Sequence, residues 1–266
     1  MTVTTIARPQ PGAITMAIVD TVDVAGRNLR SMLRMPQALI FALIQPVLFV
    51  LLFRFAFGGA IHVPGIPYVD YLIPGVFGQS VAFGALGTAV GLATDLRSGL
   101  LERFRTLPMS RVAVLAGRTV ADLARSLGVV AILAGVGFAV GFRVQTSALA
   151  FLAGLGLVAL FGYALSWGCV SLGLRISDPE AAQAAGVPVV FLLAFASGAF
   201  VPTSSMPGWL QVVADHQPLT ALVNALRALM LAGPTASAVL TTLAWSGGLL
   251  VAFAALAISQ YQRMSR

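Results

Sequence analysis

The chain has 266 residues, of which 58% are hydrophobic and 9% charged, and its mean hydropathy is +0.93. This composition excludes a water-soluble globular protein, because the apolar residues gather in runs close to the ~20 that cross a ~30 Å hydrocarbon core. The net charge is +7, and all of the positive side chains that it counts are arginines, since the sequence contains no lysine. A phosphate-binding loop of the Gly-x-x-x-x-Gly-Lys-Ser/Thr type is therefore absent, which excludes a conventional ATPase.

The N-terminal elements are expected to lie outside the membrane core. Residues 1–12 are predicted to be disordered, and residues 13–35 have the pattern of an amphipathic helix that lies along the inner leaflet. Its apolar stripe is predicted to consist of Ile14, Ile18, Val22, Leu29 and Leu33. Pro36 then turns the chain into the membrane.

Six membrane-spanning helices follow in the prediction. Each must be helical because lipid offers no hydrogen-bond partner to a free backbone amide. The spans are expected at residues 37–57, 71–94, 120–142, 148–174, 184–203 and 236–259. The predicted fold class is an all-α membrane protein with one six-span domain over residues 36–266.

Two of the spans have distinctive local sequences. Gln45-Pro46 predicts a kink in the first span. The second span has glycines at positions 75, 78, 84, 87 and 91. Small residues at this near-helical spacing predict a helix whose backbone packs closely against its neighbours, or slides along them.

The distribution of arginine orients the spans. One side of the membrane would collect Arg8, Arg27, Arg30, Arg34, Arg97, Arg103, Arg105, Arg111, Arg118, Arg125, Arg175, Arg263 and Arg266. The other side would have only Arg143 and Arg227. By the positive-inside rule, both termini are expected in the cytoplasm of a multi-pass protein of the cell membrane. The positive charge therefore indicates topology and contact with anionic lipid headgroups, and no nucleic-acid partner.

A polar loop at residues 95–119 joins the second and third spans on the predicted cytoplasmic side. It runs from Asp95 through Arg97, Arg103 and Arg105 to Arg118, with leucine and phenylalanine between the charges. Such a loop can place its apolar side chains against lipid or protein and leave its charges to a soluble partner. We therefore interpret it as a docking surface, with an ordinary solvated loop as the alternative.

Residues 204–232 are predicted to form a cap at the outer face, since this segment is too apolar for a solvated loop. Two short helices are expected, broken at Pro207 and Pro218, with Trp209 as an interfacial anchor. The cap would lie at the outer membrane interface or re-enter the membrane.

Polar and aromatic residues within the spans have both structural and functional interpretations. Arg54 is expected to reach the interface as an anchor, and Asp122 is expected to pair with Arg125 at the interface. A cargo groove is hypothesised from Phe53, Arg54, Phe57, Phe77, Phe83, Phe195 and Phe200, although core or lipid packing is the ordinary role of a phenylalanine.

Other functional classes find little support in the sequence. A single cysteine, Cys169, excludes an intrachain disulfide, and two separated histidines, His62 and His216, predict no metal site. An ion-coupled secondary transporter remains an alternative, but no central carboxylate is evident. A serine hydrolase built on Ser197 and His216 would lack a legible acid and oxyanion site, so no catalytic residue is predicted.

Several segments taken together resemble the type-2 ATP-binding-cassette exporter permeases, specifically the daunorubicin-resistance-like membrane subunits. They are the loop from Asp95 to Arg118, Gln45-Pro46, Tyr71-Leu-Ile-Pro-Gly75, Ser197-Gly-Ala-Phe-Val-Pro202, Met206-Pro-Gly-Trp209, Pro218 and Arg227. The resemblance covers nearly the whole chain. It implies a permease subunit that exports amphiphilic or lipophilic cargo, such as a drug, antibiotic or lipid.

The resemblance also implies the partners of the chain. Two copies of a separate ATPase subunit would hold ATP and magnesium, so this chain would need no cofactor of its own, and a second permease chain, identical or homologous, would complete the pathway. The surface that couples to the ATPase would consist of Gly99, Leu100, Glu102, Arg103, Phe104, Leu107 and Pro108, with Arg30 and Arg34 on the lateral helix.

Overall fold

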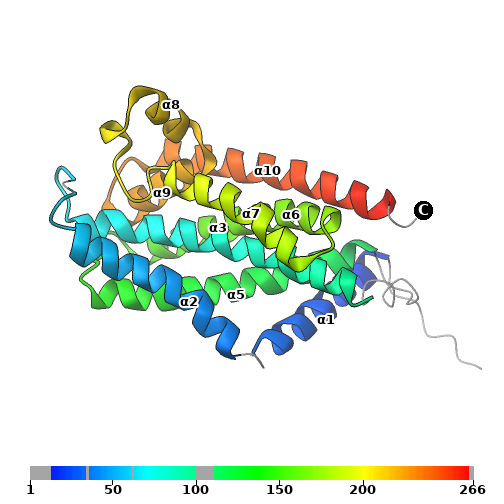
Figure 1. The fold of residues 1–266 in the computed structure, drawn as a ribbon. Helices are drawn as coiled ribbons and strands as arrows, with labels where there is room; N and C mark the ends of the chain where they lie inside the picture. Colours follow the sequence, from blue (N-terminus) through cyan, green and yellow to red (C-terminus); the bar gives the residue numbers. More distant parts are fainter. Residues whose placement is uncertain (1–12, 34–35, 62, 100–110, 264–266) are drawn as a thin grey trace, which may run out of the picture.

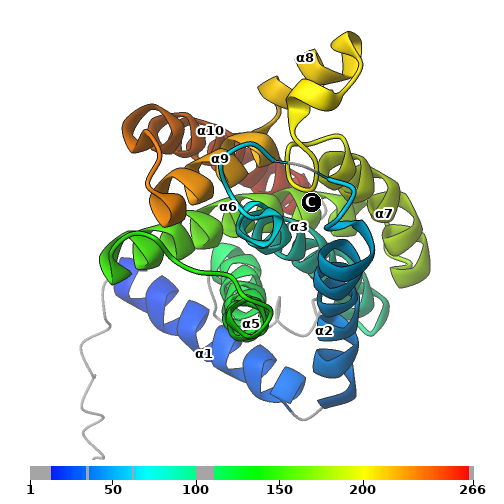
Figure 2. The same ribbon diagram turned by 90° about the vertical axis from the view of Figure 1, so that its left-hand side faces the viewer.

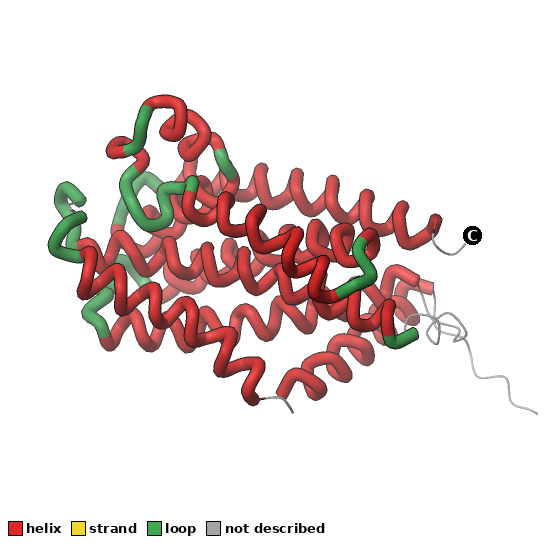
Figure 3. The backbone as a smooth tube through the Cα atoms, in the orientation of Figure 1, coloured by secondary structure: helices red, strands yellow, loops and turns green. Residues whose placement is uncertain are grey.

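The computed structural model describes residues 13–33, 36–61, 63–99 and 111–263, and these residues form helices and connecting turns with no strand (Figures 1 and 3). The helices are α1 (Ala13–Leu33), α2 (Pro36–Leu51) with its π-helical continuation η1 (Leu52–Phe57), α3 (Tyr68–Arg97), α5 (Arg111–Ala139), α6 (Ala148–Arg175), α7 (Pro179–Phe195), the 3-10 turn η2 (Thr203–Ser205), α8 (Gly208–His216), α9 (Pro218–Leu231) and α10 (Thr235–Arg263). The predicted disordered segment 1–12 lies outside the described residues.

Within the part of the chain that the structure describes, four helices are long and apolar enough to cross a membrane. They include Tyr68–Arg97, Leu115–Ala139, Ala148–Arg175 and Thr235–Arg263. The apolar segments 42–57 and 179–195 are shorter, so the first and fifth predicted spans stay predictions. All six segments lie in one bundle (Figure 1).

Helix α3 is the centre of this bundle (Figure 2). It packs against α5, α6, α7 and α9, and its first fifteen residues, 68–82, are all buried. A helix surrounded by others needs no polar face, which explains why its apolar residues follow no one-sided pattern. Every feature of the candidate site described below contacts this helix.

Helix α1 lies obliquely across the bundle and packs against α5 (Figures 1 and 2). A helix is therefore present where the lateral helix is predicted, and of the predicted apolar stripe the structure describes the burial of Val22 and Leu29, of which Leu29 is half-buried. Val22 is exposed, whereas Val24 is buried, where Gly117 of α5 lets the two helices approach closely. Val24, rather than the predicted Val22, therefore contacts the bundle at this point of α1.

The ends of three predicted segments need correction. Helix α7 ends at Phe195, so the prediction of a span to residue 203 is wrong at that end; residues 196–202, called the break below, are non-helical. Helix α3 continues to Arg97 and α5 begins at Arg111, so both ends of the loop predicted at 95–119 are helical, and its residues 100–110 lie outside the described residues. The span predicted at 120–142 is helical only as far as Ala139.

The segment predicted as an outer cap contains two helices that differ in burial. As expected, Pro207 precedes α8 and Pro218 begins α9. Helix α8 stands out from the bundle at the end opposite the C-terminus, and its Trp209 is 72% exposed (Figure 1). Helix α9 packs against α6, α10 and α3, and its Leu222 and Leu226 are fully buried. Of these two helices, α8 therefore lies at the surface and α9 belongs to the bundle.

Candidate functional site

The break after α7 is held by side chains from α3 and α9. Tyr71 Oη donates to the Gly198 carbonyl at 2.9 Å, and Tyr68 Oη donates to the Phe200 carbonyl at 3.0 Å. The amide N–H of Gly198 donates to Thr220 Oγ1 at 3.1 Å. Non-helical backbone within a membrane protein requires such partners, because lipid supplies none.

Arg227 of α9 completes this arrangement. Its guanidinium donates to the Tyr71 carbonyl at 3.1 and 3.0 Å and to the Ala199 carbonyl at 3.0 Å, and lies 3.3 Å from the centroid of the Tyr71 ring. The Ala199 backbone also approaches Gly75, where a β-carbon would lie 2.1 Å from the Ala199 oxygen. One arginine thus joins α9, α3 and the break.

A second polar cluster joins α3 and α5 nearer the other end of the bundle. It consists of Asp95 on α3 and Arg118, Asp122 and Arg125 on α5, and is called the charge network below. Arg118 Nη1 donates to Asp95 Oδ2, while Asp122 lies 3.8 Å from both Arg118 Nε and Arg125 Nε. The predicted pairing of Asp122 with Arg125 is present. However, Asp122 is 1% exposed, so the pair is buried between helices.

Glycines of α3 make room for these arginines. A β-carbon at Gly91 would overlap the guanidinium of Arg118, and one at Gly87 would lie 3.0 Å from Arg125 Nη2. At Gly84 a β-carbon would meet Ser126 Oγ at 2.7 Å, and the Gly84 carbonyl accepts from Arg125 Nη2 at 2.7 Å. Gly87 and Gly91 therefore admit the long arginine side chains of α5, and Gly84 admits Ser126; none of the three brings two helix backbones together.

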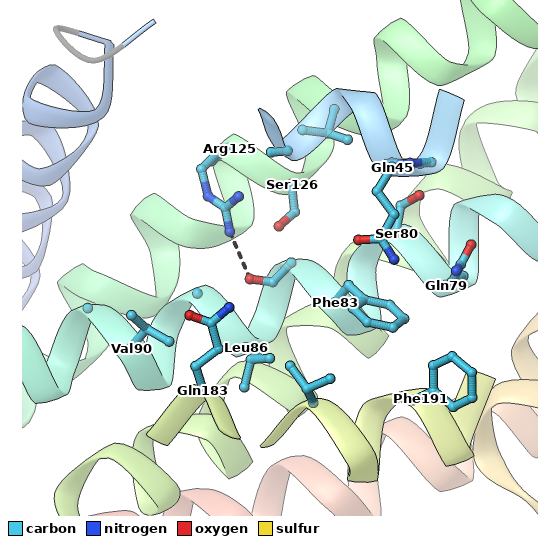
Figure 4. A pocket seen from close by; sticks show the side chains of 17 residues that line it. Gln45, Gln79, Ser80, Phe83, Leu86, Val90, Arg125, Ser126, Gln183 and Phe191 are labelled. Atoms are coloured by element: carbon cyan, nitrogen blue, oxygen red, sulfur yellow. Dashed lines mark hydrogen bonds between the residues drawn. The ribbon is translucent and has the colours of Figure 1, made fainter. Parts of the chain in front are cut away.

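The charge network ends at a cavity of about 700 Å³ between α2, α3, α5 and α7 (Figure 4). Figure 4 shows Gln45 of α2 and Arg125 of α5 on one side of α3, and Gln183 of α7 on the other. The lining residues are Ala42, Gln45, Pro46, Gln79, Ser80, Phe83, Gly84, Leu86, Gly87, Val90, Gly91, Arg125, Ser126, Val129, Gln183, Val187 and Phe191. Its volume falls within the ~300–1,000 Å³ of small-molecule sites.

The cavity combines apolar walls with uncharged hydrogen-bonding groups. Arg125 is the single charged side chain among the lining residues. Gln79 is 2% exposed, and its Oε1 has no hydrogen-bond partner in the part of the chain that the structure describes. Such a site suits a molecule with an apolar body and a few polar groups.

Comparison with known proteins identifies the chain. A model of the ABC-2 type transporter family matches residues 24–231. The chain belongs to the ABC-2 type transporter family. It is the membrane-spanning permease subunit of an ABC exporter, and the ion-coupled alternative gains no support.

Named relatives of this ABC-2 permease are permease proteins too. The daunorubicin resistance ABC transporter permease protein DrrB1 of Streptomyces coeruleorubidus is 32% identical over 246 residues, which cover 92% of this chain and 87% of the relative. The probable doxorubicin resistance ABC transporter permease protein DrrC of Mycobacterium tuberculosis is 27% identical over 226 residues, 84% of this chain and 81% of the relative. The putative transport permease ycf38 of Porphyra purpurea is 26% identical over 201 residues, 73% of this chain and 68% of the relative.

The phenylalanines predicted to line a cargo pathway fall in three places in the permease. Phe83 lines the cavity. Phe53, Phe195 and Phe200 form an aromatic cluster with Phe49, with ring centroids 4.8 Å apart for Phe53 and Phe200. Phe57, at the end of η1, extends this cluster through its contact with Phe53 and is exposed. Phe77 lies apart from the others and is fully buried in the core. Phe77 therefore has no surface to offer a cargo molecule.

Sequence reasoning missed most of the polar lining of this cavity. Arg54, predicted as an anchor or cargo contact, lies in η1 outside the lining and 5.8 Å from the centroid of the Phe55 ring. Gln79, Gln183 and Arg125 were not assigned to cargo, because polar residues on three separate helices carry no common motif. Gln45 was noted only beside the predicted kink.

The predicted coupling residues are only partly visible in the structure. Arg30 is exposed on α1, and Gly99, two residues after the end of α3, has a φ of +69°. Arg34, Leu100, Glu102, Arg103, Phe104, Leu107 and Pro108 lie outside the described residues. Arg97, two residues before Gly99, pairs with Asp178 at 3.1 Å. Asp178 also caps α7 through the amide of Ala181, so the C-terminal end of α3 and the N-terminal end of α7 adjoin.

Ser197 and His216, the two residues from which a serine hydrolase was considered, do not contact each other. Ser197, in the break, donates through Oγ to the Ala194 carbonyl of α7. His216 Nδ1, on α8, is hydrogen-bonded to the Val212 carbonyl of the same helix. Each side chain has a local structural partner, so a Ser–His pair is not formed.

Proposed function

We propose that this ABC-2 permease moves amphiphilic or lipophilic cargo, such as a drug, antibiotic or lipid, outward across the cell membrane. The cavity between α2, α3, α5 and α7 carries this proposal, because its apolar walls and its few polar groups suit such a molecule. The relatives named for daunorubicin and doxorubicin resistance support a drug-sized cargo.

The proposed topology has six spans and both termini in the cytoplasm. Helix α2 with η1 covers residues 36–57, which at ~1.5 Å per residue is long enough to cross the hydrocarbon core. Helix α7 has 17 residues, and the break that follows it extends the chain toward the outer face. The backbone of the break is hydrogen-bonded by side chains of α3 and α9, as a non-helical segment inside the membrane requires, and this supports a fifth span that continues through the break.

The proposed assembly contains two permease chains, identical or homologous, and two copies of an ATPase that binds ATP and magnesium. Apolar side chains on α2 and α7 beside the cavity are exposed, notably Ile44, Leu48 and Leu192. Membrane lipid or a second permease chain would cover them. Residues 99–108 with Arg30 and Arg34 would contact the ATPase.

Movement of the ATPase would reach the cavity through the charge network. Asp95 lies four residues before Gly99, and Arg118 lies near the start of α5, so their pair joins the two ends of the coupling segment. From there the network continues through Asp122 to Arg125 in the cavity wall. A shift of α5 against α3 would therefore alter the cavity.

Transport in inverted membrane vesicles tests this function. Vesicles that contain the permease and its partner ATPase should accumulate daunorubicin when ATP and magnesium are added. A partner ATPase without its phosphate-loop lysine is the control and should abolish accumulation. Uptake driven by an ion gradient in vesicles without the ATPase would overturn the proposal in favour of secondary transport.

A further inference from the structure

A second pocket, of about 500 Å³, lies between α8, α9 and α10 and shares no lining residue with the cavity described above. The turn between α9 and α10, residues 232–234, lies beside it at the end of the bundle opposite the C-terminus (Figure 1). In the proposed topology this is the outer end. The pocket is therefore separate from the proposed cargo site.

Arg227 gives this pocket a cation whose charge no ion pair balances. Its hydrogen bonds run through Nε and Nη2 to the Tyr71 and Ala199 carbonyls, which are uncharged acceptors. Nη1 donates to none of the residues that the structure describes, and the ion pairs among them do not include Arg227. A guanidinium that lines a pocket with donors to spare favours an anionic oxygen as ligand.

The first turn of α10 favours the same kind of ligand. Helix α10 begins at Thr235, and Ser237 and Ala238 of its first turn line the pocket. This turn contains no acidic residue. Backbone amides at a helix N-terminus lack intrahelical partners and attract negative charge, and the Ser237 hydroxyl can donate as well. Together with Arg227 of α9, this turn suits a phosphate group.

Asp215 of α8 places the opposite charge in the pocket. Its side chain is exposed, and within the described ranges neither Asp215 nor Asn224, which also lines the pocket, has a hydrogen-bond partner. Carboxylate and amide oxygens accept hydrogen bonds from a primary ammonium group. A quaternary ammonium cannot donate and is bound by aromatic faces, but none of the described lining residues is aromatic. The lining therefore favours a phosphate joined to a primary amine.

The surroundings of the pocket indicate a lipid as the source of this group. Ile66, Leu231 and Pro234 add apolar wall to the polar lining, so the ligand has room for an apolar body. Trp209, on the same helix as Asp215, is exposed, and tryptophan is enriched at the depth of lipid headgroups. A pocket at this depth meets phospholipids at high local concentration.

We propose that this pocket binds the headgroup of a zwitterionic phospholipid with a primary amine, the phosphatidylethanolamine class. The phosphate lies at Arg227 and the first turn of α10, and the ammonium lies at Asp215 and Asn224. The inference rests on the proposed topology for placing the pocket at the outer membrane interface, and it is independent of the cargo.

Short-chain phospholipids test the headgroup preference. Dioctanoyl phosphatidylethanolamine, phosphatidylcholine and phosphatidylglycerol would each be titrated into the purified full-length permease in detergent, with bound lipid measured by native mass spectrometry. We expect phosphatidylethanolamine to bind about fivefold more tightly than the other two, because phosphatidylglycerol has no amine and the choline group cannot donate. Soluble phosphoethanolamine is the fourth probe and should bind at least about tenfold more weakly than the lipid, because it has no apolar body to bury.

Variants on two helices test the two ends of the headgroup. Asp215→Asn should remove the preference for phosphatidylethanolamine, whereas Glu180→Gln, the same loss of charge at an exposed position on α7, should keep it. Ser237→Asp should weaken binding of all three phospholipids several-fold by repelling the phosphate, and an acidic residue in the first turn favours the helix, so folding should tolerate it. Ala236→Asp, exposed in the same turn but outside the lining, is its control and should weaken binding less.

The outcomes separate this site from the export function. Equal binding of the three phospholipids, tighter binding of phosphatidylcholine or phosphatidylglycerol, phosphoethanolamine binding as tight as that of the lipid, or no response to Asp215→Asn and Ser237→Asp would each overturn the inference. These titrations use neither ATP nor cargo, so such a result would leave the proposed export intact. Failure of ATP-dependent transport in a permease that shows the expected preference would contradict export and leave the lipid site standing.

Discussion

The guanidinium of Arg227 lies over the ring of Tyr71 and, at the same time, donates hydrogen bonds to the Tyr71 carbonyl. It also donates a hydrogen bond to the Ala199 carbonyl in the break. A planar guanidinium can make these contacts together, because it presents donors in its plane and a stacking face above it. Lysine has neither geometry, so the site requires arginine.

Replacement of Arg227 should therefore destabilise the permease. Arg227→Lys and Arg227→Gln both leave buried carbonyls without full partners, and we expect a loss of about 2–4 kcal/mol. Thermal unfolding of the purified protein in detergent would measure the change. Arg263→Gln, at the exposed C-terminal end of α10, is the control and should change stability by less than about 0.5 kcal/mol. Equal melting temperatures for Arg227→Gln and Arg263→Gln would contradict this role.

The sequence predicted the helices, and the turns between them, better than it predicted the contacts. Proline fixes its own φ and lacks an amide hydrogen, so Pro207 and Pro218 mark helix starts without any knowledge of the neighbours. The same local logic failed at residues 196–202. That stretch is apolar enough for a span, and its break is stabilised by Tyr68, Tyr71 and Arg227, which are distant in sequence.

The burial of α9 had a readable signal that the interpretation as a cap overlooked. Its apolar residues recur at helical spacing, as in Leu219, Leu222, Val223, Leu226 and Met230. By contrast, the fit of Arg118 against Gly91 depends on the register of two helices and has no signature in one sequence. The glycine spacing predicted close packing, which Gly75 shows against the Ala199 backbone, but it did not indicate that arginines fill the space at Gly87 and Gly91.

The fit between Gly91 and Arg118 gives a second prediction. Gly91→Ala places a methyl group where the guanidinium of Arg118 lies, so the arginine must move and its bond to Asp95 must break. We expect a stability loss of about 1–3 kcal/mol and weaker ATP-dependent transport. Thermal unfolding and vesicle transport would be measured together. Gly128→Ala on α5, where a β-carbon meets nothing within 4 Å, is the control and should be neutral or slightly stabilising.

The ion pair of Asp95 and Arg118 gives a third prediction through a double-mutant cycle. Asp95→Asn leaves Arg118 near Asp122 but without its hydrogen-bonded carboxylate, and Arg118→Gln leaves Asp95 unpaired. Because both side chains are largely shielded from water, we expect a coupling energy of about 1–3 kcal/mol in unfolding experiments. The exposed pair of Arg97 with Asp178 is the comparison and should show less than about 1 kcal/mol. Equal coupling in the two cycles would show that burial adds nothing here.

A fourth prediction concerns Gly99 at the start of the proposed coupling segment. Its φ of +69° lies in the left-handed region, where a β-branched residue is strained, and no atom outside its immediate neighbours would obstruct a side chain there. Gly99→Val should therefore redirect the chain that follows α3 while leaving the bundle intact. We expect normal membrane insertion and melting temperature, with ATP-dependent transport and capture of the ATPase reduced several-fold. Retention of both by Gly99→Val would contradict the coupling role.

The last prediction distinguishes the buried α9 from a solvated outer loop. Cys169 is replaced by alanine, and single cysteines are introduced at Leu222, Leu226 and Pro64. Leu222 and Leu226 are fully buried, whereas Pro64 is exposed on the turn between η1 and α3. A membrane-impermeant thiol reagent added from outside should label Pro64→Cys rapidly and the two α9 positions slowly, because α9 must open before its thiols are reached.

Labelling during ATP turnover adds a mechanistic test: if α9 closes the outer end of the pathway, turnover should accelerate the reaction at Leu222→Cys and Leu226→Cys and leave Pro64→Cys unchanged. Rapid labelling of all three at rest would contradict the burial of α9, and labelling of Pro64→Cys only from the cytoplasmic side would overturn the proposed topology.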